Sequence, residues 1–492
     1  DGIDEMLSKG ISFSLYMTHG GTSFGHWAGA NSPGFAPDVT SYDYDAPINE
    51  YGGTTDKYFQ LRKMMQKYSK TKLPAIPKMP ARLISIPAFR LTEYADILTG
   101  VDSVVMDSPL RTMEELGQGW GSIVYVTTLP EISTPSVLTL DEGHDFAQVF
   151  IDNKYIGKID RVRNENSLQL PAVKQGQELK IFIEAMGRIN FGRAIKDYKG
   201  ITNSVTLSTE IDGHDLIWNL KRWTILTIPD DYQTAKKALA SAPSPVTSKM
   251  GYYRGYFNLK KTGDTFLNME QFGKGQVYVN GHPVGRFWSI GPQQTLYVPG
   301  CWLKKGKNEV IVLDVVGPVQ PVMMGQAKPE LDKLNIEKSR THNNPGDKPD
   351  LNSAIPAVQG SFYAGNGWQK IRFDAPKTGR YFVLQALSTH DGKSDVAVAE
   401  IYAINADGGR LSRDSWTVKY ADSEDVLRGN FTVDKTFDLQ ESTYWRTARG
   451  TELPHLMVID LGSEQTVTGV DYLPRAEQGA PGSIKDYQIF IY

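Results

Sequence analysis

The chain has 492 residues, 40% of them hydrophobic, and its 53 lysines and arginines against 56 aspartates and glutamates give a formal net charge of −3. This balance offers no electrostatic footprint for nucleic acid or an anionic membrane, and no run of about twenty apolar residues could cross a bilayer. The single cysteine, Cys301, cannot form an internal disulfide, and the eight histidines lack zinc-ligand spacing. The length favours about three or four domains.

The first seventy or so residues follow a helix, strand, loop, helix order. Residues 1–9 place Ile3, Met6 and Leu7 on one helical face before Gly10. Residues 11–17 alternate apolar side chains with serines and a tyrosine, which predicts a buried strand, and residues 54–68 predict a second helix. This order is typical of the end of a (β/α)₈ TIM barrel, whose sites lie on the loops that follow the strands.

Three motifs in this segment, LYMTHGGTSFG, PDVTSYDYDAPINEYG and KYFQLRKM, resemble the last barrel strand, the adjoining loop and the final helix of the family 35 glycoside hydrolases, the β-galactosidases. Ser23 stands where that family usually has asparagine, and Asn49 and Tyr51 also depart from its pattern. The resemblance implies that residues 1–72 are the last strand and helices of a TIM barrel.

The resemblance also implies that no catalytic residue lies in this chain. Retaining glycosidases use two carboxyl groups about 5 to 5.5 Å apart, and in this family both are glutamates on earlier barrel strands. We therefore expect the chain to be inactive alone and to need a missing N-terminal barrel segment as its partner. The acidic loop residues Asp38, Asp43, Asp45 and Glu50 are expected to order the loop by accepting hydrogen bonds from backbone N–H groups.

What the loop can supply is a wall of the sugar site. By the resemblance, Tyr44 hydrogen-bonds the galactose, Tyr16 and Tyr42 lie near the nucleophile or the sugar ring, and Trp27 with His26 lines the mouth. Tyrosine suits this role because it combines an apolar face with a hydroxyl group. The alternative is that the alternating Tyr42 and Tyr44 are only packed.

Prolines between residues 72 and 80 end the helical pattern, and short alternating runs follow. Residues 148–158 and 276–286 repeat each other at a constant offset, each a strand, a tight turn and a returning strand. Two copies of a β-sandwich module, over 81–208 and 209–318, are the simplest account. They resemble the galactose-binding-like jelly rolls that follow the barrel in the same family, where such modules mostly buttress the barrel; Arg188 is expected to form loop or interface hydrogen bonds.

The rest of the chain is a polar, proline-rich stretch, predicted as a linker over 319–360, and an all-β region over 361–492. The latter resembles a discoidin (F5/8 type C) domain, with Trp445 in its core. That resemblance makes a structural calcium ion plausible, with no ligand set readable from the sequence. We expect no cofactor for catalysis.

The main hypothesis is that the chain is part of an exo-acting, retaining β-galactosidase that removes terminal β-linked galactose from glycans. The alternative is a noncatalytic carbohydrate-binding or adhesion protein built from jelly-roll and discoidin domains. A third hypothesis is one half of a nicked enzyme still bound to its missing piece. Family resemblance suggests an exported protein, in a periplasm, at a cell surface or in a lysosome-like compartment, and the sequence predicts no nucleic-acid partner and no transmembrane segment.

Overall fold

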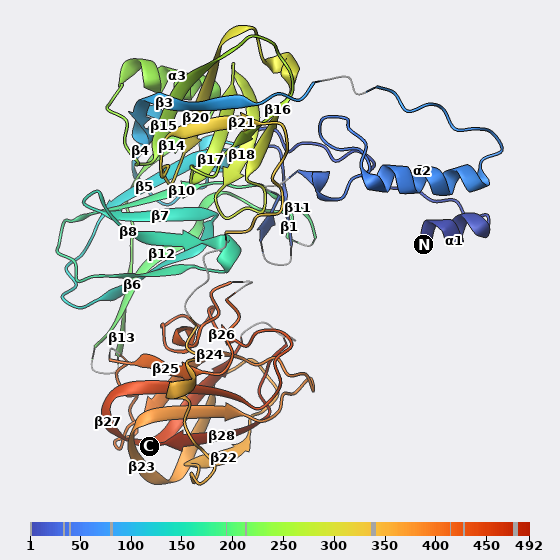
Figure 1. Cartoon of the computed structure of the whole chain (residues 1–492). Helices are drawn as coiled ribbons and strands as arrows, with labels where there is room; N and C mark the ends of the chain where they lie inside the picture. The colour runs from blue at the N-terminus through green and yellow to red at the C-terminus, as the bar shows by residue number, and fades with distance from the viewer. Residues whose placement is uncertain are drawn as a thin grey trace.

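The computed structural model describes residues 2–32, 35–38, 41–78, 82–192, 194–211, 214–335, 341–413, 415–426, 429–475 and 481–492. Three β-sandwich regions form its body, and an N-terminal helical segment extends to one side of them (Figure 1). The side chains of Tyr44 and Ile211 also lie outside the described set. No helix in the described ranges is long and apolar enough to span a membrane.

The N-terminal segment contains two helices, α1 (Gly2–Ser8) and α2 (Asp56–Tyr68). Gly10 follows α1 with a φ of 69°, a left-handed conformation that ends a helix at low cost. The helices meet at Asp4, which accepts a 2.8 Å hydrogen bond from the hydroxyl of Tyr68 and pairs with Lys67. The predicted positions of both helices are therefore confirmed.

The strand predicted over residues 11–17 is not formed. The structure gives these residues an extended backbone, and no described segment pairs with them in a ladder. A strand needs a neighbour to bond its N–H and C=O groups, and α1 and α2 offer none. The barrel end over 1–72 accordingly stays a prediction, because the described residues of this segment form two helices, a short 3₁₀ turn and the two-residue strands β1 (Ala30–Asn31) and β2 (Ala36–Pro37).

The first sandwich packs a six-stranded sheet against a four-stranded one. Their inner faces enclose a core that includes the fully buried Tyr125 and Trp223, whose rings meet edge to face at 6.1 Å. A short strand, β11 (Ile189–Phe191), lies beside the sandwich. In spatial order the first sheet is β4 (Ser103–Ser108), β14 (Trp223–Ile228), β5 (Ser122–Thr128), β10 (Glu178–Glu184), β7 (Phe146–Ile151) and β8 (Lys154–Asp160), and the second is β13 (His214–Asn219), β12 (Gly200–Ile211), β6 (Ser136–His144) and β9 (Ser167–Leu170).

The second sandwich is one eight-stranded path that folds over its own core. A helix, α3 (Tyr232–Ser241), buries Ala235, Ala238 and Leu239 at the seam between the two sandwiches. In order the strands are β18 (His282–Trp288), β17 (Lys274–Val279), β20 (Gly306–Asp314), β15 (Gly251–Leu259), β3 (Ile86–Asp96), β21 (Val322–Gln326), β16 (Thr265–Asn268) and β19 (Thr295–Val298).

Strand pairing moves the predicted domain boundaries. Strand β3, which falls inside the predicted module 81–208, pairs with β15 and β21 of the second sandwich, and Figure 1 shows it in blue among the later, yellow-green strands. Strands β13 and β14, inside the predicted module 209–318, complete the first sandwich instead. Local alternation identifies a strand but not its partner, so the sequence could not reveal this exchange.

The internal repeat takes the same form in both sandwiches. Hairpins β7–β8 and β17–β18 turn through Asp152-Asn153 and Asn280-Gly281, all four with positive φ, as a two-residue hairpin turn requires. Each ladder then slips by one residue at the equivalent place, after Val149 in one copy and after Val277 in the other. The predicted duplication is therefore a duplication of structure, bulge included.

The C-terminal sandwich has the predicted core, and it also includes residues that precede its predicted start at residue 361. Trp445 is fully buried and donates a 2.9 Å hydrogen bond to the carbonyl of Ser423. The predicted linker 319–360 contributes β21, which pairs with β16 and β3 of the second sandwich, and most of β22, which pairs with β28 of the third. The spatial order is β22 (Val358–Ser361), β28 (Asp486–Ile491), β23 (Gln369–Ala386), β27 (His455–Pro474), β24 (Ala397–Ile404) and β26 (Trp445–Arg446), with β25 (Thr417–Ala421) on β27.

Buried charges hold the two N-terminal sandwiches together. Lys274 on β17 pairs with Glu184 on β10, and both side chains are at most 5% exposed. Lys199 lies 2.7 Å from a carboxylate oxygen of Asp145 and 2.8 Å from one of Asp197, and Arg161 bonds the remaining oxygen of each carboxylate. Such pairs are costly to break, because removing one partner leaves an uncompensated charge in the interior.

We predict that Lys199→Ala destabilises the protein by about 3–5 kcal/mol, since it leaves Asp145 and Asp197 with Arg161 as their only described cation. Chemical denaturation followed by tryptophan fluorescence measures the change. The matched control is Lys196→Ala, which truncates an exposed lysine three positions away and should change stability by less than about 0.5 kcal/mol. Equal effects of the two substitutions would contradict the assignment.

Candidate functional site

The aromatic loop that the sequence singled out closes on itself at its neck. The backbone N–H of Ile48 donates to the carbonyl of Thr18 at 3.0 Å, and that of Gly20 donates to the carbonyl of Ile48 at 2.7 Å. The loop between these points therefore leaves and returns at one place, next to the start of α2.

The second sandwich clamps the loop from one side. The buried guanidinium of Arg286 on β18 donates to the carbonyls of Ala28 and Asp38, at 3.0 and 2.9 Å. Gln293 accepts a 2.7 Å hydrogen bond from the backbone N–H of Ser41. Gly285 lets the chains approach, because a Cβ there would lie 2.8 Å from the carbonyl oxygen of Ser23.

The first sandwich clamps the loop from the other side. Strand β1 pairs in parallel with β11, and Gly187 permits this approach because a Cβ there would meet the carbonyl oxygen of Gly29 at 2.2 Å. Below β1, the ring of Phe35 lies 4.2 Å from the guanidinium of Arg161 and 4.8 Å from the ammonium of Lys199, a cation–π arrangement. The loop thus rests directly on the buried charge cluster.

His26 joins the loop to the junction of the two sandwiches, and its ring also stacks on that of Trp120 at 6.1 Å; its place at the mouth of a sugar site stays a prediction. Its Nε2 is 3.2 Å from the carbonyl of Asp230 and its Nδ1 is 3.1 Å from the amide of Gln276. Burial lowers the pKa of His26 to about 4, so the ring is neutral at ordinary pH. Its role is to join the loop to both sandwiches.

Trp27, the next residue, points outward and is 71% exposed. Its ring meets that of Trp120, from the first sandwich, at 5.1 Å in a T-shaped arrangement, and Trp120 is itself 41% exposed. The sequence did not predict the contact with Trp120. This tryptophan lies between two glycines some ninety positions after Trp27, and no motif around it indicates the contact. Together the two rings form an exposed aromatic pair beside the loop.

Of the predicted sugar-wall tyrosines, Tyr42 lies within the clamped loop and Tyr16 precedes its neck at Thr18. In the described chain Tyr16 is 85% and Tyr42 43% exposed. Tyr42 begins a 3₁₀ turn, η1 (Tyr42–Tyr44), whose N-cap Ser41 accepts a hydrogen bond from the N–H of Asp43. The side chain of Tyr44 lies outside the described residues, so its contact with a sugar stays a prediction, as do the roles of Tyr16, Tyr42 and Trp27.

Two acidic groups belong to this region, the half-buried Asp43 within the turn and the buried Glu50 a few residues after it. Glu50 accepts a 2.8 Å hydrogen bond from the hydroxyl of Thr22, while its second oxygen and one oxygen of Asp43 have no hydrogen-bond partner among the described residues. Burial raises the pKa of Glu50 to about 7 and also raises that of Asp43. A neutral, buried Glu50 therefore supports the turn that presents Tyr42.

No three His, Cys, Asp or Glu side chains within the described ranges are placed to hold a metal ion. Buried carboxylates of the C-terminal sandwich are already paired, Glu400 with Arg413 and Asp425 with Arg446. The calcium ion that the discoidin resemblance suggested stays a prediction.

The arrangement defines a class of protein, a stack of β-sandwiches that holds an aromatic loop from a preceding helical segment. Comparison with known families is more specific. Residues 1–68 match the family described as glycosyl hydrolases family 35, residues 109–226 the first all-beta domain of beta-galactosidase, and residues 250–308 its galactose-binding domain. Three parts of the chain are therefore similar to domains of family 35 glycosyl hydrolases and beta-galactosidases. The predicted discoidin-like domain lies outside these ranges, and its family stays a prediction.

Individual relatives agree with these matches. Beta-galactosidase-1-like protein 3 of Homo sapiens is 35% identical over 327 residues, which cover 63% of this chain and 48% of that protein. Beta-galactosidase 1 of Dictyostelium discoideum is 32% identical over 355 residues (64% and 51%). Beta-galactosidase of Homo sapiens is 35% identical over 342 residues (63% and 48%). The chain spans about half the length of the curated relatives it matches.

The raised pKa of Glu50 predicts a pH-dependent loop. The ordinary pKa of this carboxyl group is 4.5 and its pKa in the folded loop is about 7. Between these two pH values the folded state therefore holds a proton that the unfolded state has lost. The resulting stabilisation is full below pH 4.5 and is lost as the pH rises through 7. Glu50→Gln, always neutral, should stabilise the loop at pH 8 by about 1–3 kcal/mol and leave it unchanged near pH 4.

Hydrogen exchange of amides 18–55 at the two pH values measures this difference. Glu5→Gln, at an exposed position of α1, is the control and should have no effect on these amides at either pH. A stabilisation by Glu50→Gln that is the same at both pH values would show that the carboxyl group does not titrate as assigned.

Proposed function

We propose that residues 1–68 form a galactose-facing wall of an exo-acting, retaining β-galactosidase whose two catalytic carboxyl groups lie outside residues 1–492. One observation carries this proposal: the segment that matches family 35 glycosyl hydrolases is the segment in which Tyr16 and Tyr42 are exposed. Fixed, exposed tyrosines suit a sugar, because their rings cover its C–H face and their hydroxyls bond its polar edge.

In this proposal each aromatic residue has a distinct role. Tyr44 donates a hydrogen bond to galactose, Tyr16 and Tyr42 line the ring and the nucleophile, and Trp27 with Trp120 forms the outer rim. The retaining mechanism needs a nucleophile and an acid/base, and the wall contributes orientation to both steps. Accurate orientation matters, because small displacements of bound substrate lower the rate steeply.

The two N-terminal sandwiches act as a buttress. Arg286 and Gln293 on one side, and β11 on the other, fix the loop by its backbone, which leaves its side chains free to face a ligand. The C-terminal sandwich is proposed as a discoidin-like accessory domain, and the complete protein as an exported one that acts on β-galactoside glycans.

Native and denaturing mass measurement of one preparation, with a β-galactoside hydrolysis assay, tests the proposal. A second polypeptide that carries the rest of the barrel should accompany hydrolytic activity, whereas a lone 54.8 kDa chain should be inactive. Hydrolysis by the lone chain, or an assembled pair without activity, would overturn the proposal.

We predict that Tyr44→Phe in the assembled, active protein lowers kcat/KM for a β-galactoside about tenfold, the value of one lost hydrogen bond of about 1.4 kcal/mol. Tyr68→Phe is the matched control, because its hydroxyl bonds only Asp4 in the helical segment, and it should leave kcat/KM unchanged. Equal kinetics for Tyr44→Phe and the parent protein would remove Tyr44 from the sugar site.

A further inference from the structure

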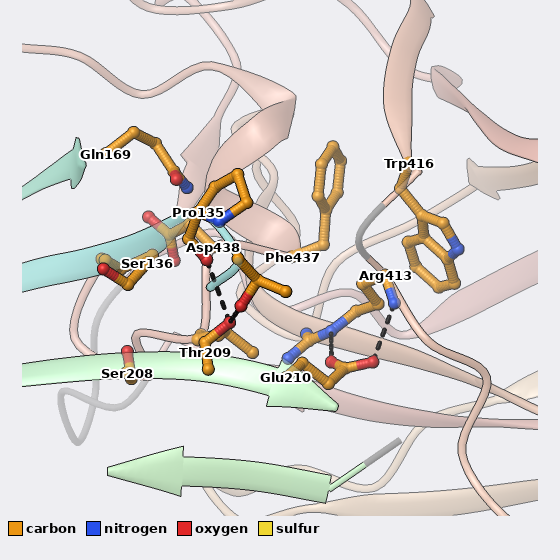
Figure 2. A pocket seen from close by; sticks show the side chains of 13 residues that line it. Pro135, Ser136, Gln169, Ser208, Thr209, Glu210, Arg413, Trp416, Phe437 and Asp438 are labelled. Carbon is orange, nitrogen blue, oxygen red and sulfur yellow. Dashed lines mark hydrogen bonds and ion pairs between the residues drawn. The ribbon is translucent and has the colours of Figure 1, made fainter. Parts of the chain in front are cut away.

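A cavity of about 350 Å³ lies between the first sandwich and the C-terminal sandwich. Its lining residues are distant in sequence from the aromatic loop. One side is the outer face of the sheet that contains β12, β6 and β9, and the other is formed by segments around residues 413–416 and 437–439. Figure 2 shows these side chains converging from the two domains.

Buried interactions at one end of the cavity hold the two domains together. Arg413 donates its backbone N–H to one carboxylate oxygen of Glu210 at 2.8 Å and its Nε–H to the other at 3.2 Å, as Figure 2 shows. Its other guanidinium donors bond Glu400, the carbonyl of Ile401 and the hydroxyl of Tyr402. The guanidinium of Arg413 is therefore hydrogen-bonded mainly to protein groups, which leaves it little capacity to bind an anionic ligand.

The sheet side of the cavity carries hydroxyl and amide groups. Val137 on β6 is opposite Ser208 on β12 and Gln169 on β9, and opposite residues of neighbouring strands share a face, so all three face the C-terminal domain. Gln169 is exposed, whereas the hydroxyl of Ser208 is buried with no partner among the described residues. A buried hydroxyl without a partner is costly, and a turn about χ1 would present it to a ligand.

The C-terminal side supplies an apolar wall and a carboxyl group. The rings of Trp416 and Phe437 meet edge to face at 5.8 Å. Asp438 accepts hydrogen bonds from the hydroxyl of Thr443 and the N–H of Gln440, and burial raises its pKa to about 6. Asp438 also pairs with Lys435 at 3.6 Å, so its carboxylate adds no uncompensated charge to the cavity lining.

We propose that this interdomain cavity is a binding site for a neutral saccharide unit. Its volume is at the small end of ligand pockets, and an aromatic wall with hydroxyl, amide and carboxylate partners matches a sugar ring's apolar and polar sides. An anionic sugar is disfavoured, because the cavity offers no uncommitted cation. Because both domains line the cavity, a bound sugar also strengthens the docking of the C-terminal sandwich.

The test is titration of the purified chain with D-galactose, methyl β-D-galactoside, D-glucose and lactose, with D-glucuronate as the anionic comparator. Saturation-transfer NMR and calorimetry report binding. At least one neutral sugar should bind saturably, Gln169→Ala should weaken that binding at least tenfold, and glucuronate should bind more weakly. The matched control is Gln175→Ala, an exposed glutamine of the same sandwich outside the cavity, which should bind like the parent chain.

Tyr42→Ala separates this site from the aromatic loop and should leave the binding unchanged. The proposal is overturned if no neutral sugar binds saturably, if Gln169→Ala binds like the parent chain, or if glucuronate binds best. A crystal soaked in the best ligand that holds only water in the cavity would also overturn it. None of these outcomes bears on hydrolysis, so the proposed β-galactosidase function stands or falls separately.

Discussion

The buried contact between Lys274 and Glu184 fixes how the first two sandwiches sit against each other, and the rest of the structure depends on that position. Around it, the outer faces of β5 and β10 meet those of β15 and β20 in a shared apolar cluster. An ion pair removed from water tolerates little displacement, because either charge alone would be strongly destabilising. The junction so formed receives His26 and Phe35, and through them the whole aromatic loop.

Much of this fold could be predicted where the signal was local. Helices α1 and α2 and the Asn280-Gly281 hairpin depend on residues close together in sequence. The repeated hairpin sequence also indicated the duplicated module. What failed was pairing at a distance: nothing near β3 reveals that it crosses into the second sandwich, and nothing near β13 or β14 that they return to the first. Residues 11–17 show the converse, since a strand-like pattern forms no strand without a partner.

The sequence pointed to the candidate side chains of the site but not to the residues that hold the loop in place. Tyr16, Tyr42 and Trp27 were named from the family resemblance, and all three are exposed in the described chain; their contact with a sugar stays a prediction. The contacts of His26 with the domain junction were missed, because a histidine beside a tryptophan gives the same sequence pattern whether it faces a ligand or a junction. Gln276, Asp230 and Arg286, which hold the loop, come from three separate segments. Only tertiary structure could bring them to it.

The junction beneath the loop combines a histidine whose pKa is about 4 with a glutamic acid whose pKa is about 7. The cost of each buried charge builds up between the ordinary pKa of the group and its pKa in the folded protein: for His26 as the pH falls from 6.5 to about 4, and for Glu50 as the pH rises from 4.5 to about 7. The two windows overlap and run in opposite directions, so what one group loses as the pH changes the other largely regains. The attachment of the loop is therefore buffered against pH over this range.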